Sequence, residues 1–427
     1  MAGGTKMKVL VVGSGGREHA LVWKLQQIPH VDKIYCAPGN AGIAQDAQCV
    51  PIGAMEFDKL IELVKTEDIG YTIIGMDEPL AGGIVDVFEA HGLKAFGPRK
   101  NAAELESSKA FSKNLMKKYN IPTANYEVFT DYKEAKEYLE KQALPIVIKA
   151  DGLALGKGVL ICNTMNEALE GLKEMMLDQK FGTAGNTVVI EEFLEGPEVS
   201  VLSFCDGKTV VPMVSAQDHK RALDYDEGLN TGGMGTFSPS KFYTKEMNDQ
   251  CMKEIFQPTV DAMIKEGRLF VGIIYFGLMY TKNGVKVIEY NARFGDPEAQ
   301  VVLPRLKTDL LEIMMACTEG ELDKKKVEWY DNAAVCVVLA SGGYPVSYEK
   351  GFEITGLNKI SKEENMVVFH AGTAKKDERF VTNGGRVLGI TGIGKNLDEA
   401  ISTAYKGVEI VDFEKKHFRH DIGVKRY

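Results

Sequence analysis

The sequence lacks the patterns that mark membrane, disulfide-linked and zinc-binding proteins. No apolar run approaches the roughly 20 residues that a membrane helix needs, and the N-terminus has no signal-peptide core. The seven cysteines show no CxxC spacing, and the seven histidines show no HExxH pattern. We therefore expect reduced core thiols, no zinc and a cytoplasmic location.

Blocks of basic residues are also missing. The net charge is −9, which argues against nucleic acid as a main partner and leaves small molecules as ligands. The 427 residues are 44% hydrophobic and 26% charged, an ordinary globular composition. A chain of this length is enough for roughly three domains. It contains no internal repeat and no low-complexity tract.

A glycine turn follows the first apolar strand. The strand covers Lys8–Val12, the turn covers Gly13–Arg17, and a helix is expected to follow. This geometry can direct backbone N–H groups at a phosphate. Glu18 stands where a GxGxxG motif has its third glycine, so a dinucleotide fingerprint is only weakly supported, and a tight turn without ligand remains an alternative. Alternating strands and helices up to His91 predict a parallel, doubly wound sheet.

A second glycine loop separates two short strands in a smaller unit. Ile146–Lys149 and Val159–Ile161 read as a hairpin, and Ala150–Gly158 as a mobile flap able to cover phosphates. The loop is not a Walker A motif, because it lacks GxxxxGK[ST] and no helix follows it. Lys149 lies in an apolar strand, where an unpaired ammonium is costly. A functional role is favoured there over a structural ion pair.

A third segment, Leu269–Glu298, predicts a hairpin that turns at Asn283-Gly284. Glu289 and Asn291 leave the same face of its second strand, and a carboxylate with an amide oxygen suits Mg²⁺ when phosphates supply further ligands. Arg293 adds a fixed cation two residues later. The alternative is a strand that ends in polar residues near solvent. Asp296-Pro297 predicts a helix start, with Asp as N-cap and Pro at the first helical position.

Other candidate site residues come from weaker patterns. A single helix is expected from Asn101 to Tyr119, and it carries Lys109. The strand Val188–Leu194 ends in acids, where backbone groups can read an adenine edge, although these residues taken by themselves favour a solvated strand end. His219 could act as a general base, but the sequence shows no orienting partner for it. The last hundred residues again look βαβ-like.

The order and spacing of these pieces resemble the ATP-grasp superfamily. The segments GSGGREHA, APGNAG, PIVIKADGLALGKGV, NTGGMG and IEYNARFGDPE resemble, more closely, the phosphoribosylamine–glycine ligase (glycinamide ribonucleotide synthetase) family. The similarity runs from about Met7 to Gly423 and leaves no residues for fused downstream activities. It implies an α/β and α+β multidomain fold. Its expected parts are an N-terminal Rossmann-like domain (1–105), an ATP-grasp domain (106–320) with a small mobile lid (about 122–188), and a C-terminal α/β domain (327–427).

The resemblance implies ATP-dependent joining of glycine to 5-phosphoribosylamine through glycyl phosphate, in purine biosynthesis. It implies ATP with Mg²⁺ or Mn²⁺, a cytoplasmic monomer, and small-molecule partners without nucleic acid or membrane. No covalent enzyme intermediate is expected. Catalysis would consist of positioning and charge neutralisation, with Arg293, Lys149 and Asp218 as the catalytic candidates.

Carried over residue by residue, the resemblance assigns three sets. The nucleotide set is Lys109, Lys149, Gly152, Gly156, Lys157, Gly158, Glu191, Phe193, Leu194 and Glu198. The substrate set is Gly13, Gly15, Gly16, Arg17, Asn40, Ala41, Gly42, Asp218, Lys220, Gly233 and Arg293. The metal set is Glu289 and Asn291.

One departure from the wider superfamily leaves the number of metal ions open. Many ATP-grasp enzymes carry another metal-binding carboxylate on the preceding strand, where this chain has Gly277, Leu278 and Met279. Three other functions remain as alternatives. They are an ATP-grasp ligase with a different acid or amine, a nicotinamide-dependent oxidoreductase, and a non-catalytic nucleotide-binding or scaffolding protein.

Overall fold

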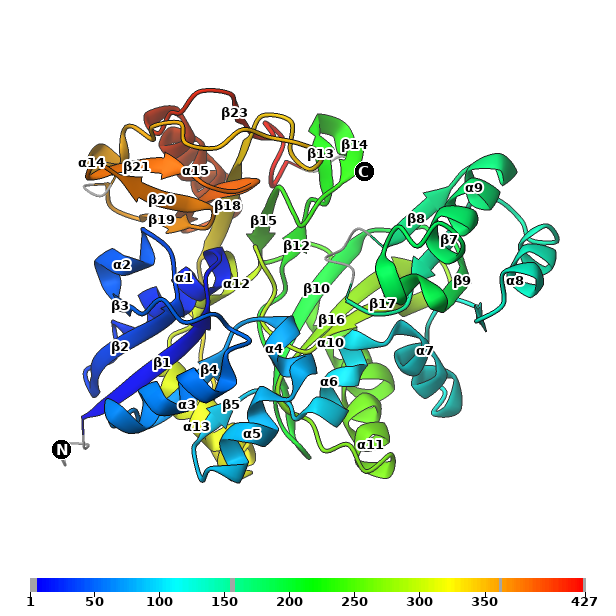
Figure 1. The fold of residues 1–427 in the computed structure, drawn as a ribbon, viewed down its shortest axis with the longest axis horizontal. Coiled ribbons are helices and arrows are strands. Elements are labelled where there is room, and N and C mark those ends of the chain that lie inside the picture. The colour runs from blue at the N-terminus through cyan, green and yellow to red at the C-terminus, as the bar shows by residue number, and fades with distance from the viewer. Residues whose placement is uncertain (1–5, 154–157, 361–362, 425–427) are drawn as a thin grey trace.

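A parallel sheet forms the N-terminal part of the computed structural model, which describes residues 6–153, 158–360 and 363–424. The strands lie in the order β3-β2-β1-β4-β5, and helices cover the sheet (Figure 1). Because both faces are covered, the inner strands are mainly apolar, and every residue of Tyr71–Ile74 is buried. The predicted doubly wound sheet is confirmed. The elements are β1 (Met7–Gly13), α1 (Gly16–Leu25), β2 (Val31–Pro38), α2 (Ile43–Asp46), β3 (Gln48–Cys49), α3 (Phe57–Thr66), β4 (Tyr71–Ile74), α4 (Asp77–Gly82), α5 (Ile84–Ala90) and β5 (Ala95–Phe96).

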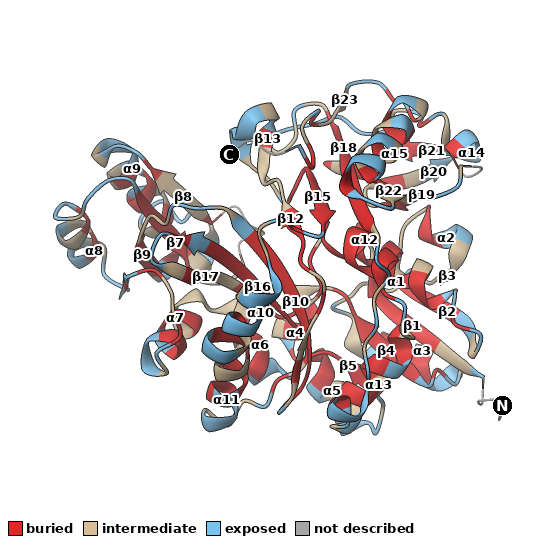
Figure 2. Ribbon diagram, turned by 180° about the vertical axis from the view of Figure 1, so that it is seen from behind, coloured by how far each residue is buried: buried red, intermediate tan, exposed pale blue. Residues whose placement is uncertain are grey.

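An antiparallel sheet, β11-β10-β16-β17, forms the centre of the molecule. Figure 2 shows buried residues, in red, along β10 and β16. The predicted hairpin is confirmed, since β16 and β17 pair antiparallel on either side of Asn283. The elements are β10 (Glu198–Asp206), β11 (Val210–Pro212), α10 (Lys245–Cys251), α11 (Gln257–Lys265), β16 (Val271–Thr281), β17 (Gly284–Asn291), α12 (Ala299–Val302) and α13 (Leu310–Glu319).

A small antiparallel sheet, β6-β9-β7-β8, projects away from the body of the molecule (Figure 1). Helices α8 and α9 pack on it, and its core is apolar. Strands β7 and β8 pair antiparallel, which confirms the hairpin around the glycine loop. The elements are β6 (Tyr126–Phe129), α8 (Tyr132–Leu139), β7 (Ile146–Ala150), β8 (Val159–Cys162), α9 (Met165–Met176) and β9 (Val188–Glu192). We refer to this unit as the lid sheet.

A further sheet, β12-β15-β18-β22-β19, combines the end of the chain with two strands from its middle. All of these strands pair antiparallel, so the βαβ-like alternation expected here is wrong. Helix α15 packs on β22 and β18. The elements are β12 (Gln217–Asp218), β13 (Arg221–Leu223), β14 (Glu227–Asn230), β15 (Gly235–Ser238), β18 (Ala333–Ser341), α14 (Leu357–Ile360), β19 (Met366–His370), β20 (Thr373–Lys376), β21 (Arg379–Thr382), β22 (Arg386–Gly394), α15 (Leu397–Ile410) and β23 (Lys416–His417).

Two predicted helices differ from those observed. The helix expected over Asn101–Tyr119 is two helices, α6 (Lys100–Ser107) and α7 (Lys109–Lys118), because the extended Ser108 caps α7 by accepting a hydrogen bond from Phe111 N. The helix start predicted at Asp296-Pro297 is also wrong, since α12 begins at Ala299. The Asp296 carboxylate instead accepts hydrogen bonds from Gln300 Nε2 and Arg17 N.

The N-terminal sheet and the C-terminal sheet meet at a tight joint. Asn40 Nδ2 donates to the carbonyls of Ser14 (2.8 Å) and His370 (2.9 Å). The backbone N–H of His370 donates to His19 Nδ1 at 2.7 Å. Gly42 lies directly against the His370 ring. No helix in the described residues is long and apolar enough to span a bilayer.

We expect Gly42→Ala to lower the free energy of unfolding by about 1–3 kcal/mol, because its Cβ would overlap the buried His370 ring. The backbone of Gly42 is in the right-handed helical region, which alanine adopts freely, so the cost comes from packing alone. Denaturant titration measures the change. The control is Gly53→Ala, where the Cβ meets the flexible Glu56 side chain. An equal loss of stability in both variants would contradict tight packing of Gly42 against His370.

Candidate active site

An ion pair between the central sheet and the segment that joins β12 to β13 lies at the centre of the site. Lys220 Nζ lies 3.0 Å from Glu289 Oε1 on β17 and 3.9 Å from Glu198 Oε2 at the start of β10. Lys220 lowers the pKa of Glu289 to about 2, and Lys149 and Lys109 add to the effect. The carboxylate of Glu289 is therefore ionised at neutral pH, as a metal ligand must be.

A buried triad from the lid sheet and α7 borders this centre. Glu191 forms an ion pair with Lys149 through one carboxylate oxygen and with Lys113 through the other, at 2.5 Å for Lys113. Burial would raise the pKa of Glu191, but the two lysines hold it below its usual range. Lys149 also donates to the carbonyl of Ile288, one residue before Glu289. The lid lysine and the metal candidates therefore face one site.

The triad changes how the acidic end of β9 is interpreted. Glu191 is buried, so the solvated strand end considered as an alternative is wrong for this residue. Glu192 is half-exposed and pairs with Lys286 at 3.1 Å. Phe193 and Leu194 follow β9 directly and are half-buried. In the pairing of β9 with β7, Glu192 lies opposite Ile146, so Phe193 and Leu194 follow the end of the strand.

The root of the glycine flap is tied to the first turn of α7. Lys109 Nζ donates to the Gly152 carbonyl at 2.9 Å. Asp151 accepts from Ser108 Oγ and from Ala110 N. Burial lowers the pKa of Lys109. Gly158 accepts a backbone hydrogen bond from Ala150, whereas Gly156 and Lys157 lie outside the described residues.

Arg293 is held by a carboxylate that the sequence patterns missed. Its Nη2 lies 2.8 Å from Glu106 Oε1, and its Nη1 donates to the carbonyl of Phe294. Its Nε is buried and has no hydrogen-bond partner among the described residues. Glu106 also accepts from Ala292 N at 2.7 Å. In the amide orientation that satisfies its partners, Asn291 donates to Glu106 at 3.2 Å. No spacing in the sequence distinguishes Glu106 from the other acids of its helix.

Two acids lie on the opposite side of Lys220. Glu298 is buried and accepts from Tyr275 OH at 3.2 Å and from Ser200 Oγ at 3.4 Å. Burial raises the pKa of Glu298 above its usual range. Burial, together with the Glu298 charge, raises the pKa of Asp218 well above its usual range. Both acids therefore favour their neutral forms more than a free carboxyl group does.

His219 has no geometry for general base catalysis. Its Nδ1 contacts the Gly235 carbonyl at 3.3 Å, and burial lowers its pKa to about 4. The side chain packs against Phe237. We therefore assign His219 a packing role.

Two N–H groups of the first glycine turn donate to carboxylates of the protein itself. Gly15 N donates to Glu18 Oε2 at 2.7 Å, and Arg17 N donates to Asp296 Oδ2 at 3.4 Å. The Arg17 guanidinium pairs with Glu18. Gly13 and Gly16 allow close approach, because a Cβ would meet Glu18 at the first and Gln300 at the second. The turn thus serves as a contact between parts of the chain, beside the site.

The other substrate candidates also lie at this junction. Arg386 Nη1 donates to the carbonyls of Gly232 (2.8 Å), Asp296 (2.9 Å) and Gly233 (3.4 Å). Asn40 uses its Oδ1 to accept from Gly42 N.

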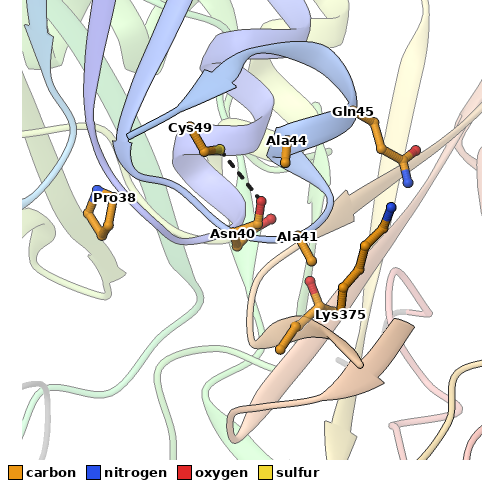
Figure 3. Close-up of a pocket in the computed structure, with 9 residues that line it drawn as sticks. Pro38, Asn40, Ala41, Ala44, Gln45, Cys49 and Lys375 are labelled. Atoms are coloured by element: carbon orange, nitrogen blue, oxygen red, sulfur yellow. Dashed lines mark hydrogen bonds between the residues drawn. The ribbon is translucent and has the colours of Figure 1, made fainter. Parts of the chain in front are cut away.

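Figure 3 shows a neighbouring pocket of about 390 Å³. It is lined by Pro38, Asn40, Ala41, Ala44, Gln45, Cys49, Thr373, Ala374 and Lys375.

We expect Glu191→Gln to destabilise the lid sheet by about 3–5 kcal/mol, because it leaves two buried ammonium groups with one charge partner fewer. Hydrogen exchange of the β7 and β9 amides measures the local opening free energy. The matched control is the adjacent Glu192→Gln, whose half-exposed pair should cost at most about 1 kcal/mol. Equal protection in the two variants would contradict a buried triad.

Comparison with family models extends over most of the chain. Residues 7–106 match the phosphoribosylglycinamide synthetase N domain, residues 107–299 match its ATP-grasp (A) domain, and residues 334–425 match its C domain. A phosphoribosylamine–glycine ligase of Halalkalibacterium halodurans is 51% identical over 419 residues, covering 98% of this chain and 97% of that protein. A Gallus gallus protein named trifunctional purine biosynthetic protein adenosine-3 is 49% identical over 98% of this chain, which corresponds to 42% of that protein.

Solved structures agree with the family models. The crystal structure of a phosphoribosylamine–glycine ligase from Thermotoga maritima is 37% identical, with a TM-score of 0.85, and the match covers 97% of this chain and 99% of that one. A biotin carboxylase domain from Hydrogenobacter thermophilus, in complex with MgADP and bicarbonate, has a TM-score of 0.75 at 15% identity and shares the fold alone. The multidomain fold and the resemblance stated from the sequence are confirmed. The chain belongs to the phosphoribosylglycinamide synthetase family.

Proposed function

We propose that this site joins glycine to 5-phosphoribosylamine in two steps. The chain is an ATP-dependent ligase of purine biosynthesis, as its family membership and its relatives at about half identity support. In the first step a glycine carboxylate oxygen attacks the γ-phosphorus of ATP, which gives glycyl phosphate and ADP. In the second step the amine nitrogen attacks the acyl carbon, the acyl–phosphate C–O bond breaks, and phosphate and one proton leave.

One observation carries this proposal. Lys109, Lys149 and Lys220 come from three distant segments. Lys220 pairs with Glu289 at 3.0 Å, Lys149 donates to the carbonyl of the preceding residue, and all three lower the pKa of Glu289. Cations from three segments that converge beside one ionised acid suit a polyphosphate and its metal ion. A structural cluster would need fewer cations, because each buried ammonium adds a desolvation cost.

The residues fit a divalent metal of the hard type. Among the described residues no three His, Cys, Asp or Glu side chains gather into a cluster, so Glu289 and Asn291 would share the ion with phosphate oxygens. With its amide nitrogen directed at Glu106, Asn291 turns its amide oxygen away as a hard ligand. We take the ion to be Mg²⁺, with Mn²⁺ as a substitute. When bound, it neutralises charge on the phosphoryl oxygens.

The nucleotide would lie between the lid sheet and the central sheet. Lys109 and Lys149 would neutralise its phosphates, and the flap that begins at Gly152 would cover them. Phe193 and Leu194 would offer backbone groups to adenine with Glu191, and Glu198 would hold the ribose. Glu191 also fixes Lys149, so one carboxylate would serve both ends of the nucleotide.

Glycine and the amine would bind on the other side of the metal. The unpartnered, buried Nε of Arg293 supports pairing with the glycine carboxylate and, later, with the acyl phosphate. Asp218 and Lys220 lie on the side of the Gly233 loop, where the phosphoribosyl group would enter beside the Gly13–Arg17 and Asn40–Gly42 loops. Arg17 N donates to the Asp296 carboxylate, and Arg386 donates to the carbonyls of Asp296 and Gly233, which supports a shared wall for that group. We further propose a cytoplasmic monomer that does not bind nucleic acid or membranes.

We expect ADP release only when glycine, 5-phosphoribosylamine and Mg²⁺ are all present with ATP. Chelation of the metal should abolish turnover, because the phosphate charge is then left uncompensated. Coupled measurement of ADP with mass detection of the product tests this. Equal turnover with bicarbonate or alanine in place of glycine would point to a different ATP-grasp ligase.

We expect Glu289→Gln to lower kcat at least about 100-fold, because a neutral amide replaces the charged metal ligand that three lysines surround. Half-saturating Mg²⁺ should rise in the same variant. Steady-state kinetics with Mg²⁺ titration measures both values. Lys282→Gln, at the exposed turn of the same hairpin, is the control and should behave as the parent protein. Parent-like turnover of Glu289→Gln would remove the metal role.

A further inference from the structure

Helix α6 ends beside β17, and the last turn of the helix brings one acid to the site. Glu106 accepts from three consecutive residues of the other segment. These contacts join its carboxylate to the Asn291 side chain (3.2 Å), Ala292 N (2.7 Å) and the Arg293 guanidinium (2.8 Å). Its side chain is only 8% exposed. One buried carboxylate thus contacts the metal candidate, the strand end and the substrate cation together.

The contacts with Glu106 determine which atoms of Asn291 and Arg293 remain available for ligands. The contact to Asn291 is made by the amide nitrogen, so the amide oxygen points away from Glu106. The contact to Arg293 is made by Nη2, and Phe294 takes Nη1, so the buried Nε is the donor without a partner. Glu106 therefore binds the Asn291 amide nitrogen and Arg293 Nη2, which the proposed reaction does not use. The Asn291 amide oxygen and Arg293 Nε, which the reaction would use, do not contact it.

The hydrogen bond from Ala292 N to Glu106 fixes the backbone from which the Asn291 and Arg293 side chains extend. Strand β17 ends at Asn291, so Ala292 N has no place in the strand ladder, and Glu106 accepts from it instead. Without this acceptor the N–H would be left to find another partner, and the run from Asn291 to Arg293 would lose its link to α6. The carboxylate thus extends the fixed part of β17 by two residues.

We propose that Glu106 is a positioning residue that holds Asn291 and Arg293 in one fixed relation, so that the metal ion and the glycine carboxylate are aligned together. This inference rests on the proposed function. Residues that orient a metal ligand typically change affinity or activity about 10–100-fold when substituted. A guanidinium can align a carboxylate for attack only when a partner fixes the orientation of the guanidinium plane. Small displacements of the reacting groups lower the reaction rate.

The competing explanation is that Glu106 only stabilises the contact between α6 and β17. A buried ion pair can do that without influence on catalysis. The two explanations differ in the kinetic parameters that they move. A structural contact lowers the unfolding midpoint and reduces the amount of active protein, whereas positioning changes the dependence on Mg²⁺ and on glycine in the protein that is folded.

The test compares Glu106→Gln with Glu104→Gln in the full-length protein. Glu104 lies on the same helix and pairs with Arg268 at 2.6 Å, away from Asn291 and Arg293, so it is the matched control. For Glu106→Gln we expect kcat to fall at least about 10-fold. Half-saturating Mg²⁺ and KM for glycine should each rise several-fold, while KM for ATP stays within about two-fold. Glu104→Gln should leave all four values unchanged.

A double-mutant cycle separates the two arms of the proposal. If Glu106 acts on glycine through Arg293, Glu106→Gln should add nothing to KM for glycine once Arg293 is replaced in Arg293→Met. The rise in half-saturating Mg²⁺ should persist there, because it passes through Asn291. Full additivity on KM for glycine would overturn the arm through Arg293.

A second variant, Glu106→Asp, tests the proposal if Glu106→Gln does not fold. Glu106→Asp keeps the charge but is one methylene shorter, so it should keep the unfolding midpoint near the parent value and still raise half-saturating Mg²⁺ and KM for glycine. Parent-like values for both parameters in either folded variant would overturn the proposal. Failure of the proposed function is distinguishable, because the parent protein itself would then show no glycine-dependent ADP release.

Discussion

The ion pair between Lys220 and Glu289 is the interaction on which the rest of the site depends. At a separation of 3.0 Å the attraction between two unit charges is several kcal/mol for an effective dielectric constant of about 20. It places an ammonium from the β12–β13 region against the central sheet. Lys109 and Lys149 can then lie near the same acid without excess positive charge, because Glu289 and Glu191 compensate them. Removing the central acid would leave several cations facing each other.

Local patterns were sufficient for much of this site. The hairpin at Asn283-Gly284 and the hairpin around the glycine flap follow from turn chemistry and strand alternation, which act over a few residues. Glu289 and Asn291 share a face because strands have a period of two residues. Lys149 was conspicuous because an apolar strand seldom carries a lysine. The arrangement of Glu289, Lys149 and Lys220 in one site was accessible only through the family resemblance.

Other features depend on contacts between distant segments, which no local pattern encodes. Glu106 resembles any acid on a half-exposed helix until β17 ends against it. Asp296 and Pro297 have the residue types of a helix start, yet the carboxylate is engaged by Arg17 and Gln300, and α12 starts later. The turn Gly13–Arg17 resembles a phosphate cradle, but Glu18 and Asp296 accept from its N–H groups. Donor geometry alone does not reveal which acceptor a turn will find.

The mixed origin of the C-terminal sheet has a consequence for biogenesis. Strands β12 and β15 lie near the middle of the chain, and β15 pairs with β18, which begins at Ala333. During synthesis on the ribosome β12 and β15 emerge together and can pair with each other, but the second edge of β15 has no partner until β18 follows. The sheet that holds Asp218, on β12, is therefore incomplete until β18 has been translated. A premature stop codon before β18 would leave an exposed strand edge open to misassembly, and not a smaller working ligase.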